Sequence, residues 1–169
     1  MTGERSTLVG GDKLRAVLRA VGVAGARALG VALYREAERI MARSKTEFVP
    51  SDMGILRASG FVKPAEVSAT SVSVTLGYGG AAKAYALYVH EGTGPAVGRP
   101  AFFPPLEAIR AWAKRHGLPE AAAFPIARAI GRRGLRPLKY LERPVLEAVP
   151  GMDGRLAAVV RREVARATR

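Results

Sequence analysis

The spacing of hydrophobic residues divides the chain into a helical beginning, a short β-rich middle and a helical end. Between residues 13 and 47 the hydrophobic positions recur every three or four residues, which predicts one long amphipathic helix. Gly22, Gly25 and Gly30 lie inside it, and each weakens a helix by about 1 kcal/mol relative to alanine. We expect these glycines to allow a bend or the close approach of a neighbouring segment.

The middle of the chain, residues 48–100, is predicted to form a small sheet with loops. In residues 71–76, valine and leucine alternate strictly with serine and threonine, which is the pattern of a half-buried strand. Phe61 and Val62 are expected in an earlier, antiparallel partner strand. Glycine and proline occur at nearly every second or third position of residues 92–105, which predicts a loop.

The last part, residues 101–169, is predicted to be helical. Its hydrophobic segments are "LEAIRAWAKRHG", "PEAAAFPIARAIGRRG", "YLERPVLEA" and "RLAAVVRREVARATR". Gly117 and Gly134 are expected to end the first two helices, and Pro144 to interrupt the third. The whole predicts a single α+β domain with a long N-terminal helix, a small antiparallel sheet and several C-terminal helices, preceded by a flexible N-terminus at residues 1–12.

Composition excludes several classes of site. The chain has no cysteine, which excludes disulfides, thiolate metal sites and cysteine nucleophiles. His90 and His116 are the only histidines, and the sequence contains no HExxH, G-x-S-x-G, dinucleotide-binding or P-loop pattern. We therefore expect no enzyme, no cofactor and no metal site. No hydrophobic run approaches the roughly 20 residues that a membrane helix requires.

Charge is the other strong feature. The formal net charge is +13, and residues 101–169 alone hold 14 basic and 6 acidic residues. Such a field suits a nucleic acid or an acidic protein, although a solvated surface of scattered arginines gives the same count. The absence of asparagine and glutamine fits either a thermophilic source or GC-rich codon bias. The residues expected to contact DNA or an acidic partner are Arg128, Arg132, Arg133, Arg136 and Lys139.

Three segments resemble, in their order, the motifs of one protein family. They are "VPSDMGILRASG", "YALYVHEGTG" and "RPLKYLERPVLEA". After a long N-terminal helix, they resemble the tail-completion, or neck, proteins of long-tailed bacteriophages over residues 13–149. The chain departs from that family at Met53, where threonine is usual, and at Leu138 and Tyr140, where a Pro-Phe-Leu pattern is usual. It also carries an insertion between the second and third segments that only part of the family has.

The resemblance implies a structural virion protein of the head–tail junction, made in the host cytoplasm. Copies of such a protein form a ring, six-fold in most cases, between the head connector on the portal side and the tail terminator or tail tube. DNA passes through the lumen of that ring. Phe102 and Phe103 are expected to make an assembly contact, although their spacing and flanking prolines also suit core side chains. The alternative, from charge alone, is a non-sequence-specific nucleic-acid-binding protein of a thermophile.

The resemblance also implies structural roles for residues of the first two motifs. Glu91 is expected to accept hydrogen bonds from backbone or arginine groups, and Thr93 to close a turn through its hydroxyl. Asp52 is expected to cap the segment that follows it, and Arg57 to pair with an acidic residue. An ordinary solvated turn residue is the alternative for each of them. The other motif residues expected to be structural are Gly54, Tyr85 and Gly92.

Overall fold

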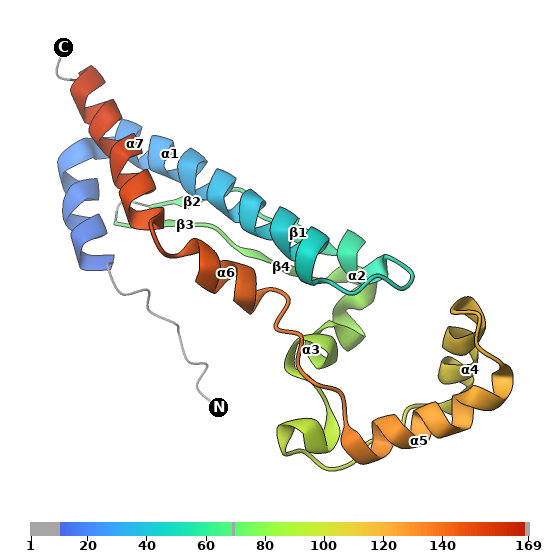
Figure 1. Ribbon diagram of the computed structural model, residues 1–169. Helices are drawn as coiled ribbons and strands as arrows, with labels where there is room; N and C mark the ends of the chain where they lie inside the picture. The colour runs from blue at the N-terminus through green and yellow to red at the C-terminus, as the bar shows by residue number, and fades with distance from the viewer. Residues whose placement is uncertain (1–10, 69, 168–169) are drawn as a thin grey trace. The chain divides into compact units, whose positions relative to one another are not determined.

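A computed structural model describes residues 11–68 and 70–167 of the chain (Figure 1). Its fold is α+β, with a long N-terminal helix, short strands and several C-terminal helices, which confirms the predicted class. Residues 1–10, which belong to the N-terminus expected to be flexible, lie outside the described residues. The described helices are α1 (Gly11–Arg43), α2 (Ile55–Ala58), α3 (Lys83–Glu91), α4 (Leu106–Arg115), α5 (Ala123–Arg133), α6 (Glu142–Ala148) and α7 (Met152–Ala167). The described strands are β1 (Gly60–Val62), β2 (Glu66–Val67), β3 (Val72–Ser73) and β4 (Leu76–Tyr78).

The chain separates into two compact units, and each is assembled from segments that lie far apart in the sequence. The first unit contains the chain up to Ser44, the segment Gly60–Gly77 and the chain from Arg143 onward. The second unit contains Lys45–Ser59 and Tyr78–Glu142. That the whole chain folds as one domain stays a prediction.

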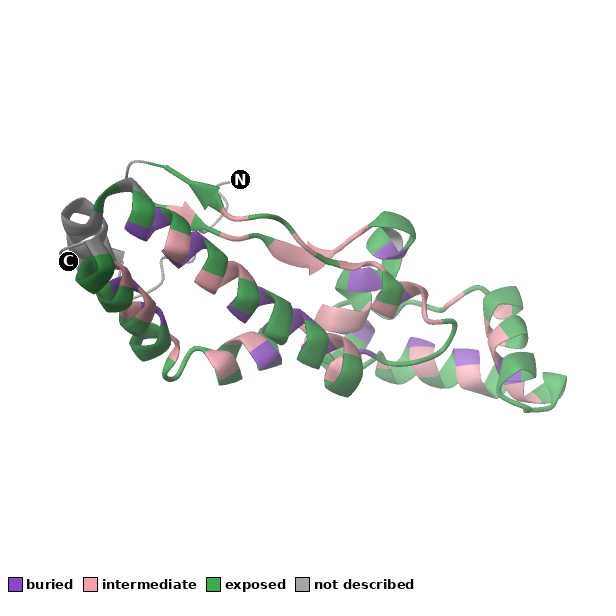
Figure 2. Ribbon diagram, turned by 90° about the horizontal axis from the view of Figure 1, so that it is seen from above, coloured by how far each residue is buried: buried purple, intermediate pink, exposed green. Residues whose placement is uncertain are grey.

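The first unit is organised by the packing of α7 against α1 (Figures 1 and 2). Leu29 of α1 is buried against Leu156 and Val160 of α7. Burying an aliphatic side chain of this size stabilises a fold by about 1.5–3 kcal/mol. Beside this cluster the buried carboxylate of Glu36 accepts two hydrogen bonds from the Arg155 guanidinium, both at 3.0 Å. These bonds hold the pKa of Glu36 below its ordinary value, so α1 and α7 share an ion pair as well as a hydrophobic contact.

Two of the three glycines that were expected to shape α1 have the predicted roles. Gly22 has φ 69° and ψ −167°, which interrupts the helical geometry and produces a kink. A Cβ atom placed on Gly30 would lie 3.2 Å from the Cβ of Ala65 and 3.3 Å from Cγ2 of Val67. Gly22 therefore bends the helix, and Gly30 lets the segment that contains β2 approach it closely.

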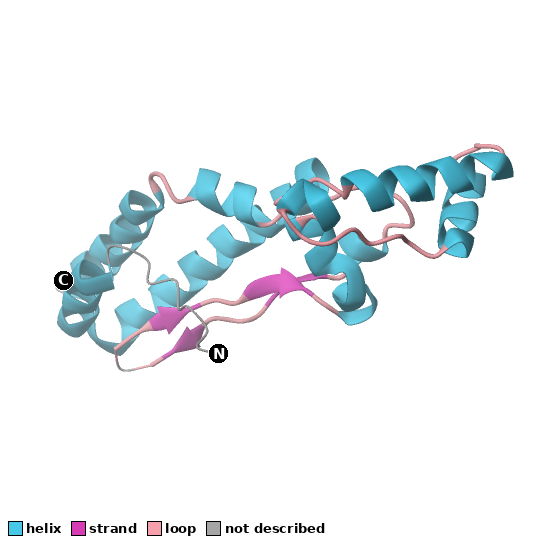
Figure 3. Ribbon diagram, turned by 90° about the horizontal axis from the view of Figure 1, so that it is seen from below, coloured by secondary structure: helices cyan, strands magenta, loops and turns pink. Residues whose placement is uncertain are grey.

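The strands form narrow two-stranded pairings instead of one broad sheet (Figure 3). β1 pairs with β4, and β2 pairs with β3 in antiparallel register, with Val67 opposite Val72. The alternation predicted for residues 71–76 is confirmed, since the valine and leucine positions are partly buried and the serine and threonine positions are exposed. Phe61 lies in β1, and a Cβ atom on Gly77 of β4 would meet its ring at 3.3 Å. The predicted strand is divided, since Leu76 lies in β4 and pairs with the Phe61 strand, whereas Val72 and Ser73 form β3 and pair with β2. The predicted pair is therefore confirmed only in part.

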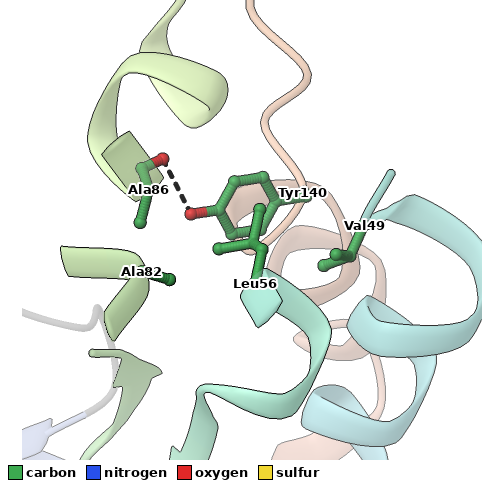
Figure 4. Packing of buried hydrophobic residues seen from close by; sticks show 5 residues of the cluster. All are labelled: Val49, Leu56, Ala82, Ala86 and Tyr140. Atoms are coloured by element: carbon green, nitrogen blue, oxygen red, sulfur yellow. Dashed lines mark hydrogen bonds between the residues drawn. The ribbon is translucent and has the colours of Figure 1, made fainter. Parts of the chain in front are cut away.

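Tyr140 stands at the centre of the core of the second unit. Its side chain is buried, and its hydroxyl donates a hydrogen bond of 2.8 Å to the carbonyl oxygen of Ala86. Its ring meets that of Tyr78 edge to face, with 4.9 Å between the ring centroids. Burial raises the pKa of Tyr140 to about 12. The buried members of this cluster are Val49, Leu56, Ala82, Ala86 and Tyr140 (Figure 4).

The helix pair α4–α5 belongs to the second unit and follows the sequence prediction closely. Ala113 of α4 and Ala127 of α5 are buried, while the charged positions of both helices face solvent. Gly117 and Gly134 follow the two helices with φ values of 69° and 73°, which are the left-handed values expected of glycine at a helix end.

Two predictions about helices are wrong. α3 occupies part of residues 48–100, where only sheet and loops were expected. Pro144 does not interrupt a helix, because it lies in the first turn of α6. Backbone N–H groups in the first turn make no hydrogen bond within the helix, so a proline there removes none. None of the described helices is both long and hydrophobic enough to cross a bilayer.

Candidate functional site

The segment "YALYVHEGTG" forms the end of α3 and the turn that leaves it. The helix stops at Gly92, whose φ of 77° and ψ of 176° are accessible essentially to glycine alone. The backbone N–H groups of Leu138 and Lys139 donate to the carbonyl oxygens of Val89 and His90, at 3.2 and 3.1 Å. A distant part of the chain therefore satisfies the last carbonyls of this helix.

Two extended segments meet immediately after α3. The N–H of Thr93 donates to the carbonyl oxygen of Leu135 at 2.9 Å, and the N–H of Leu135 donates to that of Thr93 at 3.1 Å. The Leu135 N–H also lies 3.2 Å from the Thr93 hydroxyl oxygen. The hydroxyl thus holds a segment 42 residues away instead of closing its own turn. We call this contact between residues 92–94 and 134–135 the glycine crossing.

Glycine is required at this crossing because the two backbones are in direct contact. A Cβ atom on Gly92 would lie 2.5 Å from the carbonyl oxygen of Leu135, and one on Gly94 would lie 3.1 Å from the Cα of Gly134. A Cβ atom on Gly134 would collide with the Thr93 carbonyl and approach the backbone nitrogen of Ala96 to 2.9 Å. All three glycines have positive φ. The resemblance implied a structural role for Gly92, and Gly134 was expected only to end a helix, so the contact between their segments was not predicted.

An ion-pair cluster lies beside the crossing. The ammonium group of Lys139 is 2.8 Å from a carboxylate oxygen of Glu91 and 2.9 Å from one of Glu142. Nε2 of His90 lies 3.6 and 3.8 Å from the same two carboxylates. His90, Glu91 and Glu142 offer three metal-ligand atoms within 4.8 Å of one another, but Lys139 already brings a positive charge to both carboxylates. The arrangement is that of a structural ion pair.

The pKa values in this cluster follow from its contacts. The hydrogen bond from Lys139 holds the pKa of Glu91 below its ordinary value, and the same bond raises the pKa of Lys139. Partial burial lowers the pKa of His90, whose ring meets Tyr140 edge to face at 4.8 Å between centroids. His90 is therefore neutral at pH 7. Neither His90 nor His116 hydrogen-bonds a hydroxyl group in the described part of the chain, so no nucleophile–base pair is formed.

Asp52 does not cap the segment that follows it, and this prediction is wrong. The residue that precedes α2 is Gly54, with φ 73° and no side-chain hydrogen bond to the helix end. Asp52 instead accepts hydrogen bonds from Nη2 of Arg115 at 2.8 Å and from His116 at 3.2 Å. The bond from Arg115 lowers the pKa of Asp52. This carboxylate therefore joins the first motif to the end of α4.

Arg57 does not pair with an acidic residue in the described part of the chain, so this prediction is also wrong. One Nη atom lies 3.4 Å from the carbonyl oxygen of Val49, and Nε is buried without a hydrogen-bond partner.

Two residues of the second motif remain. Tyr85 lies on α3 and is partly exposed. Glu91 accepts from a lysine, where arginine or backbone groups were expected.

Three phenylalanines stand exposed around α4 and α5. Phe102 is 61% exposed, Phe103 57% and Phe124 63%, so the interpretation of the first two as core side chains is wrong. The Phe103 ring lies directly on Gly131 of α5, since any side chain at Gly131 would collide with it. An open hollow of about 270 Å³ between the helices is lined in part by Leu106 and Phe124.

The basic residues near the end of α5 differ in their contacts. Lys139 is engaged by Glu91 and Glu142. Arg128, Arg132, Arg133 and Arg136 are exposed and have no carboxylate within 4.0 Å among the described residues. The predicted basic group therefore consists of one internal ion pair and four arginines that remain open to a partner.

Comparison with known proteins adds no assignment, since no family model, no curated protein and no solved structure matches the chain.

Proposed function

We propose that the chain is a structural protein of the virion of a long-tailed bacteriophage, located at the junction of head and tail. Copies of it form a ring, six-fold as in the family it resembles, which joins the head connector to the tail terminator or tail tube. Its function is assembly, not catalysis. It is made in the host cytoplasm and becomes part of the particle, with DNA passing through its lumen.

The observation that carries this proposal is the meeting of the three family-like segments in one core. Val49 and Leu56 come from the first segment, Ala86 from the second and Tyr140 from the third, and they pack in a single buried cluster. Glu91 of the second segment pairs with Lys139 of the third. Segments that share a catalytic role would bring nucleophiles, bases or metal ligands together. These segments bring together hydrophobic side chains and glycines, and the two carboxylates that lie beside His90 are already paired with Lys139. The contacts between the segments therefore support a structural role.

The surface of the second unit supports an assembly role. Phe102, Phe103 and Phe124 are more than half exposed, and so are Leu87 and Tyr88 of α3. Phe103 lies against α5 and Phe124 lines the hollow between α4 and α5, and an exposed hydrophobic patch of this kind is typical of a surface that another protein covers. Covering a half-exposed phenylalanine contributes about 1 kcal/mol or more to association.

Quantitative mass spectrometry of purified particles tests the proposal. The particles are those released by cells that carry the coding sequence, and we expect the chain in a small, fixed ratio to the head connector. Phe102→Ser combined with Phe124→Ser should lower its incorporation, whereas Leu146→Ser should not. Leu146 is a matched control because it is 62% exposed but belongs to the first unit. Particles that are complete without the chain would rule the proposal out.

A further inference from the structure

The chain from residue 121 to residue 141 contains five basic residues and no acidic residue. Four of the five, Arg128, Arg132, Arg133 and Arg136, are exposed without a carboxylate partner in the described part of the molecule. Two other arginines of the second unit do have carboxylate partners: Arg110 pairs with Glu107, and Arg115 pairs with Asp52. The open arginines of this stretch therefore form a surface of a single sign.

Arg133 and Arg136 line an open hollow of about 620 Å³, together with Pro95, Ala96 and Gly134. The hollow has no acidic residue and no large hydrophobic side chain in its lining. The glycine crossing fixes the backbone of this hollow. Leu135 lies between the two arginines in the sequence, and it is bridged to Thr93. Two guanidinium groups on a fixed backbone make a place for an anion without the cost of ordering a loop.

The chemistry of this hollow favours phosphate over a protein carboxylate. Guanidinium groups bind phosphate oxygens through paired, charge-assisted hydrogen bonds. A docking site for an acidic protein is centred on buried aromatic or aliphatic side chains, and this lining offers only proline, alanine and glycine besides the arginines. Arg128 and Arg132 continue the positive surface one turn apart along α5, which suits a ligand with repeated negative charges.

We infer that Arg133 and Arg136 bind a backbone phosphate of a nucleic acid and that Arg128 and Arg132 contact neighbouring phosphates of the same strand. Contacts of this kind position a nucleic acid without reading its sequence. The identity of the polymer as DNA in transit rests on the proposed function, whereas the binding site does not. It gives a ring at the head–tail junction a defined contact with the DNA that passes through it.

Binding of a short labelled DNA duplex to the full chain, measured by fluorescence anisotropy at several salt concentrations, tests the inference. Arg133→Ala with Arg136→Ala should weaken binding on the order of tenfold or more near 0.1 M salt. Because the pair binds one phosphate, the double variant should also reduce the slope of log affinity against log salt by about 0.9. The control is Arg161→Ala with Arg162→Ala, which removes the same charge from exposed positions of α7 in the first unit. We expect it to leave the slope unchanged and to weaken binding by less than about threefold.

Three results would overturn the inference. They are no measurable DNA binding by the full chain, equal losses in the two double variants, and competition by poly-glutamate as effective as that of DNA at equal charge. The last result would indicate an acidic protein as the ligand. Circular dichroism of each variant shows that a loss of binding is not a loss of folding. The particle composition tests the proposed function separately, so either idea can fail while the other stands.

Discussion

Gly134→Ala is the substitution for which the structure makes the strongest prediction about stability. Gly134 has φ 73° and ψ −176°, a region that is essentially restricted to glycine and costs about 1–3 kcal/mol for other residues. A methyl group there also collides with the carbonyl of Thr93. To relieve that collision, the two backbone hydrogen bonds between Thr93 and Leu135 must lengthen or break, at about 1 kcal/mol each.

Together these effects predict a loss of about 3–5 kcal/mol, which is a large part of the stability of an ordinary domain. The matched control is Gly98→Ala. Gly98 is also left-handed, with φ 69° and ψ 19°, but no atom lies within 4 Å of the position of its Cβ. Alanine at Gly98 therefore carries only the backbone cost, about 1–2 kcal/mol.

Urea unfolding followed by the fluorescence of Trp112 measures both variants. Trp112 is the only tryptophan and lies on α4, so its signal reports on the second unit. A Gly134→Ala variant no less stable than Gly98→Ala would refute the argument that the crossing depends on direct backbone contact.

Three further predictions concern buried polar groups. Tyr140→Phe removes the hydrogen bond to the Ala86 carbonyl and should lower the free energy of unfolding in urea by about 1–2 kcal/mol. In the unsubstituted protein, an ultraviolet titration should show one tyrosine that ionises only near pH 12. Arg155→Ala leaves the carboxylate of Glu36 buried without its main partner, so thermal unfolding should show a loss of about 2 kcal/mol at pH 7 that shrinks at acidic pH as the carboxyl group protonates. Burial lowers the pKa of His90, so the unfolded chain takes up this proton at a higher pH than the folded chain does; stability is full above about pH 6.5 and falls as the pH drops below it. A His90→Phe variant should show a smaller loss between neutral and mildly acidic pH, and an unchanged pH dependence would contradict the assignment.

The sequence was sufficient for the parts of the fold that carry a regular pattern. The alternation in residues 71–76 and the periodicity of α4 and α5 are local, because one side of each element faces a core and the other faces water. The glycines of α1 were also informative, since glycine disfavours a helix, and the structure shows a kink at Gly22 and a close approach at Gly30.

α3 was missed for a physical reason. Its large side chains Leu87 and Tyr88 point to solvent, while the small Ala86 faces the core. The usual relation between hydrophobic size and burial is therefore reversed, and tyrosine and valine favour strands in any propensity-based interpretation. Such an exposed hydrophobic face fits a protein that another protein covers.

The glycine crossing and the ion pairs beside it could not be predicted from the sequence for a different reason. Thr93 meets Leu135 across 42 residues, and Lys139 meets Glu91 across 48. Nothing in the local sequence of either segment specifies its partner. The motifs identified Glu91 and Thr93 as structural residues, but only the fold shows which groups they hold.

Electron microscopy of the particles made after deletion of the coding sequence is the most direct test of the joining role. The account predicts DNA-filled heads and complete tails that are separate, and it predicts joined particles again when a second copy of the coding sequence supplies the chain. Joined, infectious particles in the absence of the chain would contradict it.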